Sequence, residues 1–387
     1  MSHPNAREIL EALVGFPTVS RDTNLPLIDW VEGYLTDLGI KAYRVPKEGD
    51  PSKHGLYCSV GPDASGGVVL SGHTDVVPVG GQDWSTDPWV VTERSGNLFG
   101  RGTCDMKGFD ALALHALQKA VVSDLKKPLQ IALSFDEEIG CTGATPLIEG
   151  MQETVPKAEI AIIGEPSMMK CVTGHKGSMG YDIHVRGFEV HSSLMHTGVN
   201  AIMSAAELIT WANARNAENQ AQTPSTLAAI FEPPWTTLHA GQIKGGTAHN
   251  ITAGDCFFDF DFRFTPDADV EDWERRLRDK VAEIEAQMKA IYPDAGFTLN
   301  DSFNVPGLLP ESEGAAEARV RAITGDNATH VVSYGTEAGH FQNGGYSSVV
   351  CGPGNIEQAH QADEFISIAQ FEAGEAFLSK LVDTLCE

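Results

Sequence analysis

Long apolar runs, paired cysteines and basic residues are all scarce in this chain of 387 residues. No apolar run is long enough to span a bilayer, so we expect no transmembrane helix. The seven cysteines are scattered and contain no C-x-x-C pair, which argues against a disulfide framework and against a cysteine zinc site. Residues 1–16 lack the basic segment of a secretory signal and instead carry the apolar stripe of an amphipathic helix. These features predict a cytoplasmic protein.

The charge balance of the chain is strongly acidic. Lys and Arg number 27 against 53 Asp and Glu, which gives a formal net charge of −26 at pH 7. Nucleic acids and anionic membranes bind clustered basic side chains, so we expect neither as a partner. With 42% hydrophobic and 21% charged residues, the composition is that of a globular protein rather than a disordered one.

The apolar patterns predict two kinds of sheet. Four short apolar runs between residues 56 and 163 alternate with helical patterns and look buried on both faces, which is typical of a mostly parallel α/β sheet flanked by helices. Residues 56–60 are a possible hairpin partner of residues 68–70. Further along, residues 181–186 and 256–264 alternate strictly between apolar and polar side chains, which indicates a sheet with one exposed face.

This change of pattern predicts a domain inserted into another domain. The α/β domain comprises residues 1–177 and 301–387, because a buried strand and a closing helix return at the end of the chain. A smaller α+β domain, with an antiparallel sheet and two amphipathic helices, occupies residues 178–300.

Polar side chains stand where the predicted strands of the α/β domain end. His73 and Asp75 follow the run at residues 68–70, and on an extended strand their side chains point to the same side. Ligands bind at the carboxyl ends of strands in such sheets. Taken alone, the pair is more simply explained as a core histidine satisfied by its neighbour than as a metal ligand with an orienting carboxylate.

Four further loops have the same placement, and together they change this interpretation. Their polar residues are Asp105, Glu137 with Glu138, Glu165, and His360. Singly, Asp105 could cap a helix, and the three acidic residues at 136–138 could lie in a solvated loop, because burying them is costly unless cations compensate. Five loops that offer histidines and carboxylates at one edge of a sheet instead predict a hydrolytic site with two metal ions, for which zinc is suited.

The motifs SGHTDVVPV, GRGTCDMKG, SFDEEIG, IIGEP, GHKG and GPGNIEQAHQADEF are spread over essentially the whole chain. Through them the chain resembles the di-zinc aminoacylase/carboxypeptidase family of metallopeptidases. The resemblance implies two zinc ions per chain, for which cobalt can substitute. The implied ligands are His73 and Glu165 for one zinc, Glu138 and His360 for the other, and Asp105 as the bridge between them.

The resemblance also implies roles for the remaining residues of the site. Asp75 is expected to orient His73, and Glu137 to act as the general base and then as the acid. The peptide bond that follows Asp105 is expected to be cis. Apart from the resemblance, we expect Glu337 to meet the cationic end of the substrate.

Three residues of the inserted domain have implied roles in the reaction. His191 is expected to polarise the scissile carbonyl, and Asn250 and Arg263 to bind the substrate carboxylate. A structural role for His191, and a salt bridge between Arg263 and an acidic neighbour on the same strand face, remain the alternatives. The domain is expected to close over the substrate as a lid and to form the interface of a homodimer.

The implied activity is the hydrolysis of a small N-acyl amino acid, N2-acetyl-L-ornithine, to L-ornithine and acetate, a step of arginine biosynthesis. Succinyl-diaminopimelate, another N-acyl amino acid or a dipeptide are the alternative substrates. A metal-stabilised binding protein without catalysis and a metal-free structural protein are the alternatives from other classes.

Overall fold

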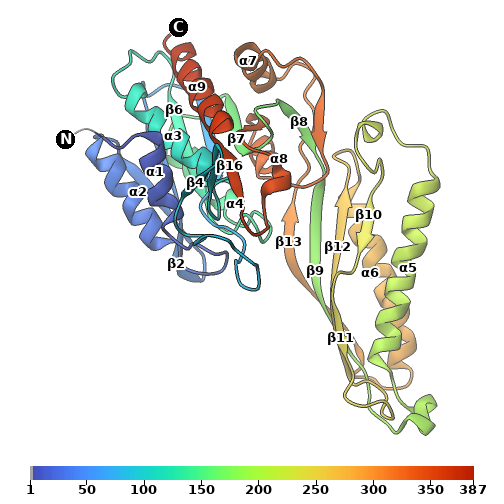
Figure 1. Cartoon of the computed structure of the whole chain (residues 1–387). Coiled ribbons are helices and arrows are strands. Elements are labelled where there is room, and N and C mark those ends of the chain that lie inside the picture. Colours follow the sequence, from blue (N-terminus) through green and yellow to red (C-terminus); the bar gives the residue numbers. More distant parts are fainter. Residues whose placement is uncertain (1–2) are drawn as a thin grey trace. The chain divides into compact units, whose positions relative to one another are not determined.

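The computed structural model describes residues 3–387, so Met1 and Ser2, with which the predicted domain 1–177 begins, lie outside the described residues. The chain divides into two compact units (Figure 1). Unit 1 comprises Met1–Gly174, Leu308–Val331 and Thr336–Glu387, and unit 2 comprises His175–Gly307 and Val332–Gly335. Unit 1 is therefore discontinuous in the sequence, and unit 2 is inserted into it.

Unit 1 is built on an eight-stranded sheet with the order β1-β2-β6-β3-β7-β15-β8-β14. Its centre is parallel: β3 (Val68–His73) pairs with β6 (Leu129–Ser134) and β7 (Ile160–Pro166), and β7 pairs with β15 (Ser347–Gly352). Every residue of β3, β6 and β7 is buried, as predicted for strands that are covered on both faces. The outer strands are β1 (Ala42–Lys47), β2 (Asp50–Val60), β8 (Val172–His175) and β14 (His330–Val332). The predicted α/β class of this unit, with its mostly parallel sheet, is confirmed.

The hairpin expected between residues 56–60 and 68–70 is wrong. Strand β6 lies between β2 and β3, and β2 pairs with β6 in the antiparallel direction. Strand β3 is buried on both faces and has a parallel neighbour on each side, so neither of its edges is open to β2. Strand β2 therefore pairs with the outer edge of β6.

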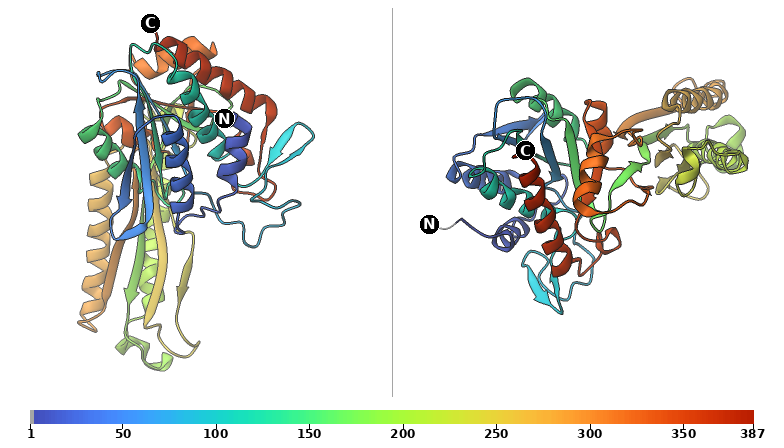
Figure 2. Two further views of the ribbon diagram at one scale, coloured as in Figure 1. Left: turned by 90° about the vertical axis from the view of Figure 1, so that its left-hand side faces the viewer. Right: turned by 90° about the horizontal axis from the view of Figure 1, so that it is seen from above.

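Helices cover this sheet, as Figure 2 shows from two further directions. The helices of unit 1 are α1 (Ala6–Val14), α2 (Leu25–Asp37), α3 (Lys107–Ala120), α4 (Ala144–Thr154), α7 (Ala315–Thr324), α8 (Ala338–Asn343) and α9 (Ile368–Thr384), with the 3-10 turn η3 (Ile356–Gln358). Helix α3 packs between α1 and α9 and against β3. The predicted amphipathic helix near the start of the chain is α1, which buries Ile9, Leu10, Leu13 and Val14. A three-stranded sheet of β4 (Thr92–Arg94), β5 (Asn97–Phe99) and β16 (Phe365–Ser367) completes the unit.

Unit 2 is an antiparallel sheet with two long helices. Its strands are β9 (Gly177–Arg186), β10 (Thr237–His239), β11 (Ile243–Gly245), β12 (Asp255–Phe264) and β13 (Gly296–Val305), and its helices are α5 (Ala201–Ala221) and α6 (Val270–Lys289), with the short turns η1 (Ser192–Thr197) and η2 (Ala228–Ile230). The alternation predicted for β12 is confirmed: Phe258, Phe260 and Phe262 are buried in one core with residues of both helices, and the intervening residues are more exposed.

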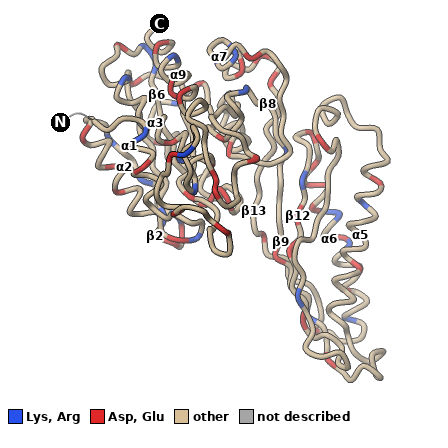
Figure 3. The backbone as a smooth tube through the Cα atoms, viewed as in Figure 1, with Lys and Arg blue, Asp and Glu red and all other residues tan. Residues whose placement is uncertain are grey.

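Acidic residues occur throughout both units, so the negative net charge does not come from one segment (Figure 3). Within residues 3–387, no helix combines the length and the apolar character that crossing a bilayer requires.

Candidate active site

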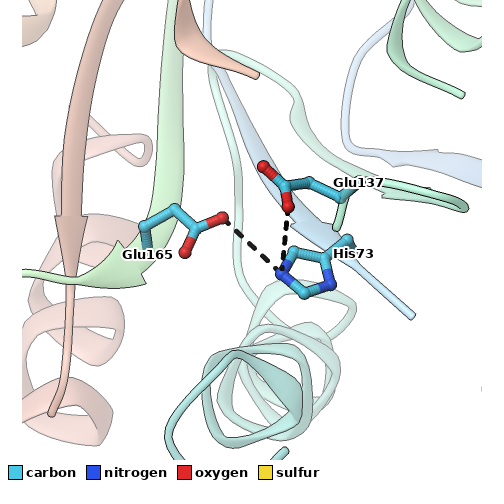
Figure 4. Close-up of side chains that lie close together, drawn as sticks. All are labelled: His73, Glu137 and Glu165. Atoms are coloured by element: carbon cyan, nitrogen blue, oxygen red, sulfur yellow. Dashed lines mark ion pairs between the residues drawn. The ribbon is translucent and has the colours of Figure 1, made fainter. Parts of the chain in front are cut away.

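The residues singled out in unit 1 meet at one edge of its sheet. His73 is the last residue of β3, and Glu165 is the last but one of β7. Glu137 lies in the loop that follows β6. Figure 4 shows the side chains of these three residues pointing toward one another. Because parallel strands end at the same edge, residues far apart in the sequence are brought together here.

His73 lies at the centre of one group of possible metal ligands. The side chain is buried, and its Nε2 lies 3.1 Å from Asp105 Oδ1, 3.6 Å from Glu165 Oε1 and 4.0 Å from Glu137 Oε2. An imidazole nitrogen and several carboxylate oxygens within such distances form a donor set that zinc prefers. His73, Glu137 and Glu165 can hold one ion, and His73, Asp105 and Glu138 form an overlapping group.

His360 forms a second group around the other oxygen of Asp105. Its Nε2 lies 3.2 Å from Asp105 Oδ2 and 2.9 Å from Glu138 Oε2. Asp105 therefore offers one oxygen to each histidine, which is the arrangement that a carboxylate bridging two ions needs. Asp105 does not cap α3, because the N-cap residue is Met106 and no side chain caps this helix. The peptide bond between Asp105 and Met106 is cis, as expected.

Asp75 contacts His73 and also holds the loop after β6. Nδ1 of His73 donates to the main-chain oxygen of Asp75 at 2.9 Å, and the Asp75 carboxylate lies 3.7 Å from the same nitrogen. That carboxylate accepts the N–H groups of Glu137 at 3.1 Å and Glu138 at 3.4 Å, and the hydroxyl of Ser20 at 2.7 Å. Asp75 thus fixes a ring orientation and the main chain of two acidic residues together.

The loop at residues 136–138 is not solvated, so that alternative is wrong. Asp136 is fully buried and pairs with Lys53 and, at 2.6 Å, with Lys47. The side chain of Glu137 is only 11% exposed. The two lysines therefore supply the positive charge that the burial of Asp136 requires. Oε1 of Glu138, in contrast, is buried with no hydrogen-bond partner among the described residues.

Burial and mutual contacts shift the proton equilibria of the site. Burial raises the pKa of Glu137 to about 8, that of Glu138 to about 7, and that of Glu165 well above its ordinary value. Hydrogen bonds to Asp105 and Glu138 raise the pKa of His360 to about 10. Burial lowers the pKa of His73, but the hydrogen bond to Asp105 and the nearby carboxylates outweigh it, so the pKa is raised well above normal. In the metal-free chain these carboxyl and imidazole groups thus bind protons more readily than usual, and a metal cation can replace those protons.

Three residues around the site carry contacts that sequence reasoning missed. Glu364 is buried and accepts the N–H groups of Cys104 and Asp105 at 3.0 and 3.1 Å, and it pairs with the buried Arg101. Gln82 contacts both Arg101 and His360. Glu364 and Arg101 stand within the motifs noted above, but their pairing across 263 residues leaves no local signal.

Glu337 stands immediately before α8 and is 1% exposed. Its Oε2 accepts the hydroxyl of Ser71 at 3.1 Å, and its Oε1 is buried without a hydrogen-bond partner in the described part of the chain. Burial raises the pKa of this carboxyl to about 7. The expected substrate-binding group therefore lies beneath the surface, against β3.

The other three predicted residues belong to unit 2. His191 is exposed, and its Nδ1 accepts the N–H of Ser193 at 3.2 Å and lies 2.8 Å from the Ser193 hydroxyl. Asn250 is exposed, and its main-chain oxygen accepts the N–H of Ser192. Arg263 is exposed in β12 and lines a cavity of about 530 Å³. Among the described residues it makes no salt bridge, so the ion pair considered for it is absent, and its neighbour Asp261 pairs with His239 instead.

The chain matches a known family of peptidases over most of its length. The model of peptidase family M20/M25/M40 matches residues 69–384. The chain belongs to this family. An acetylornithine deacetylase of Myxococcus xanthus is 35% identical over 99% of this chain and 98% of its own length, and one of Pasteurella multocida is 33% identical with the same coverage.

Solved structures of M20 proteins share the fold. An M20 family metallo-carboxypeptidase of Sulfolobus solfataricus superposes with a TM-score of 0.79 at 16% identity, covering 99% of both chains. A dinuclear metal binding peptidase of the M20 family from Bacillus subtilis gives 0.66 at 13% identity, covering 98% of this chain and 97% of its own. The family and the ligand groups make this protein a metal-dependent hydrolase.

Proposed function

We propose that this protein is a zinc-dependent amidohydrolase that removes the acetyl group of N2-acetyl-L-ornithine, giving L-ornithine and acetate in arginine biosynthesis. The observation that carries the proposal is the sharing of Asp105 between two histidine-centred groups of ligands. Relatives named acetylornithine deacetylase, at 32–35% identity over nearly the whole chain, support the choice of substrate.

The residues fit two zinc ions by their chemistry. The proposed ligands are His73 and Glu165 for the first ion, Glu138 and His360 for the second, and Asp105 for both. Two imidazoles and three carboxylates form a donor set typical of zinc and also accept cobalt. Oε1 of Glu138, buried without a partner among the described residues, supports the fit, because such an atom is costly unless a cation meets it.

Glu137 is the proposed general base. When bound, the ions lower the pKa of water and polarise the acyl carbonyl. The Glu137 carboxylate lies beside the ligand groups, and the thiol of Cys141 donates to its Oε1 at 3.2 Å. The other oxygen is left to accept the proton of the attacking water and then to deliver it to the leaving amine. In the metal-free chain burial raises the Glu137 pKa to about 8. Cations bound beside it would favour the carboxylate form that a general base requires.

Three residues of unit 2 are proposed to act on the substrate. Since Nδ1 of His191 accepts from Ser193, its Nε2 carries the proton in the neutral ring and can donate it to the oxygen of the acyl group. Arg263, exposed and without an ionic partner in the described residues, can bind a carboxylate with two parallel hydrogen bonds, and Asn250 can add an amide contact.

Glu337 is proposed to meet the cationic end of ornithine. Its buried Oε1 has no hydrogen-bond partner in the described residues, and a buried carboxylate is stabilised by an approaching ammonium group. The proposal also includes a cytoplasmic homodimer joined through unit 2. Exposed apolar side chains of that unit support an interface: Leu194 is 51% exposed, Met195 53% and Met203 59%.

Side-by-side rates on a panel of substrates test this proposal. The panel is N2-acetyl-L-ornithine, succinyl-diaminopimelate and a dipeptide, assayed on one preparation whose metal content is measured. We expect the highest kcat/KM on acetylornithine. A preference for either of the other two substrates contradicts the proposed specificity, and no hydrolysis of any of them by zinc-loaded protein contradicts the proposed reaction.

A further inference from the structure

The two histidines of the site are held in very different ways. His73 ends a central strand, and its side chain is 1% exposed. The His360 side chain is 53% exposed and stands in the loop between η3 and β16, where its own φ is +63°, a conformation that residues other than glycine rarely adopt. A ligand on such a loop needs contacts of its own to keep its ring near Asp105.

Gln82 supplies such a contact to the main chain of His360. Its Nε2 donates to the His360 carbonyl oxygen at 2.9 Å. Its Oε1 accepts from Arg101 Nη2 at 2.6 Å and from the indole of Trp84 at 3.0 Å. An amide whose oxygen faces two donors and whose nitrogen faces a carbonyl has only one satisfactory orientation.

A chain of contacts leads from Gln82 to the bridging carboxylate. Arg101 is fully buried, and in addition to its contact with Gln82 it pairs with Glu364. Glu364 in turn accepts the main-chain N–H of Asp105. Arg101 and Glu364 thus hold Asp105 without the help of Gln82, whereas the hydrogen bond from Gln82 to the His360 carbonyl ties the His360 loop to this network.

We propose that Gln82 is a positioning residue for the metal ion that His360 binds. By fixing the His360 main chain, it keeps the imidazole within reach of Asp105 and Glu138. The inference rests on the two-metal centre of the proposed function and adds an asymmetry to it. Loss of the hydrogen bond from Gln82 weakens binding of the ion at His360 and leaves binding of the ion at His73 and Glu165 unchanged.

Two substitutions separate this role from simple packing. Gln82→Glu keeps the shape and the contact with Arg101, but it places an oxygen that cannot donate against the His360 carbonyl. Gln82→Ala removes the side chain altogether. Gln361→Ala is the matched control, because Gln361 is the next residue after His360 and donates from the same kind of amide to a main-chain oxygen, that of Glu357. His360→Ala is the reference for loss of the ligand itself.

The measurement is calorimetric titration of each metal-free full-length variant with Zn²⁺, together with its melting temperature in chelator. We expect Gln82→Glu and Gln82→Ala to bind one ion as wild type does and the other on the order of 10–100-fold more weakly, the range for groups that orient metal ligands. Gln361→Ala should bind both ions as wild type does.

Two results overturn the inference. One is binding of both ions by Gln82→Glu within twofold of wild type. The other is an equal loss of affinity for both ions together with a lower melting temperature in chelator, because a residue that only stabilises the fold would give that pattern. Wild-type protein that binds two ions but fails to hydrolyse acetylornithine contradicts the proposed substrate and leaves this inference standing.

Discussion

Replacing Glu137 with Gln isolates the proton transfer from the rest of the site. The two side chains have the same shape, and a Gln oxygen can still accept from the Cys141 thiol, as Glu137 Oε1 does at 3.2 Å. The Asp75 carboxylate accepts the main-chain N–H of residue 137, so the loop keeps its anchor. What is lost is the ability to accept a proton from water.

The expected cost is that of removing a general base. Such groups contribute about 10²–10⁴-fold, which at 1.36 kcal/mol per tenfold corresponds to roughly 3–5 kcal/mol of activation free energy. We therefore expect kcat for acetylornithine to fall by about 10²–10⁴-fold with little change in KM, in a steady-state assay at saturating zinc. Glu149→Gln is the matched control, because Glu149 is an exposed carboxylate on α4, and it should keep full activity.

Metal content decides between the two possible roles of Glu137. Its Oε2 lies 4.0 Å from His73 Nε2, so it also belongs to a group that can hold an ion. If Glu137 is the base, the Gln variant keeps two zinc ions per chain by elemental analysis. Retained activity, or loss of one ion together with activity, refutes the assignment.

Three further predictions follow from the contacts of the site. Asp75→Asn places an amide against the main-chain N–H donors of the loop after β6. Zinc affinity and kcat/KM should each fall by about 10–100-fold, but saturating zinc should still fill the site. A site that stays empty at saturating zinc contradicts this prediction. Lys53→Met removes one of the two lysines that pair with the buried Asp136 and should cost about 3 kcal/mol in urea unfolding, with partial recovery in the double variant Lys53→Met/Asp136→Asn. An unchanged unfolding midpoint refutes this prediction. In the folded metal-free chain the pKa of His360 is about 10, against 6.5 for a free imidazole. The stability of the metal-free protein should therefore fall as pH rises from 6.5 to 9, and should fall less in His360→Ala. The gain in melting temperature on adding zinc should grow over the same pH range.

The elements that carry the site could be predicted because their signals are local. The buried strand that ends at His73 and the alternating phenylalanines of β12 are visible in short windows of sequence. The gathering of the proposed metal ligands was expected from a rule about where parallel strands end, together with the family resemblance.

What could not be predicted depends on pairing between distant residues. The position of β2 beside β6 is a choice among sheet edges that no short pattern specifies. Lys53 neutralises Asp136 across 83 residues, and inside β2 it looks like any exposed lysine. Gln82 stands in a loop rich in Gly, Asp, Trp and Pro, and its role depends on a carbonyl 278 residues away.

Two metal ions, held on either side of Asp105, are proposed to support hydrolysis of acetylornithine. Titration of the metal-free wild-type chain with Zn²⁺, with bound zinc and the rate of acetylornithine hydrolysis measured at each point, tests it most directly. We expect two zinc ions per chain at saturation and activity that appears with zinc and disappears with a chelator. Saturation at one ion or none, or full activity in excess chelator, contradicts it.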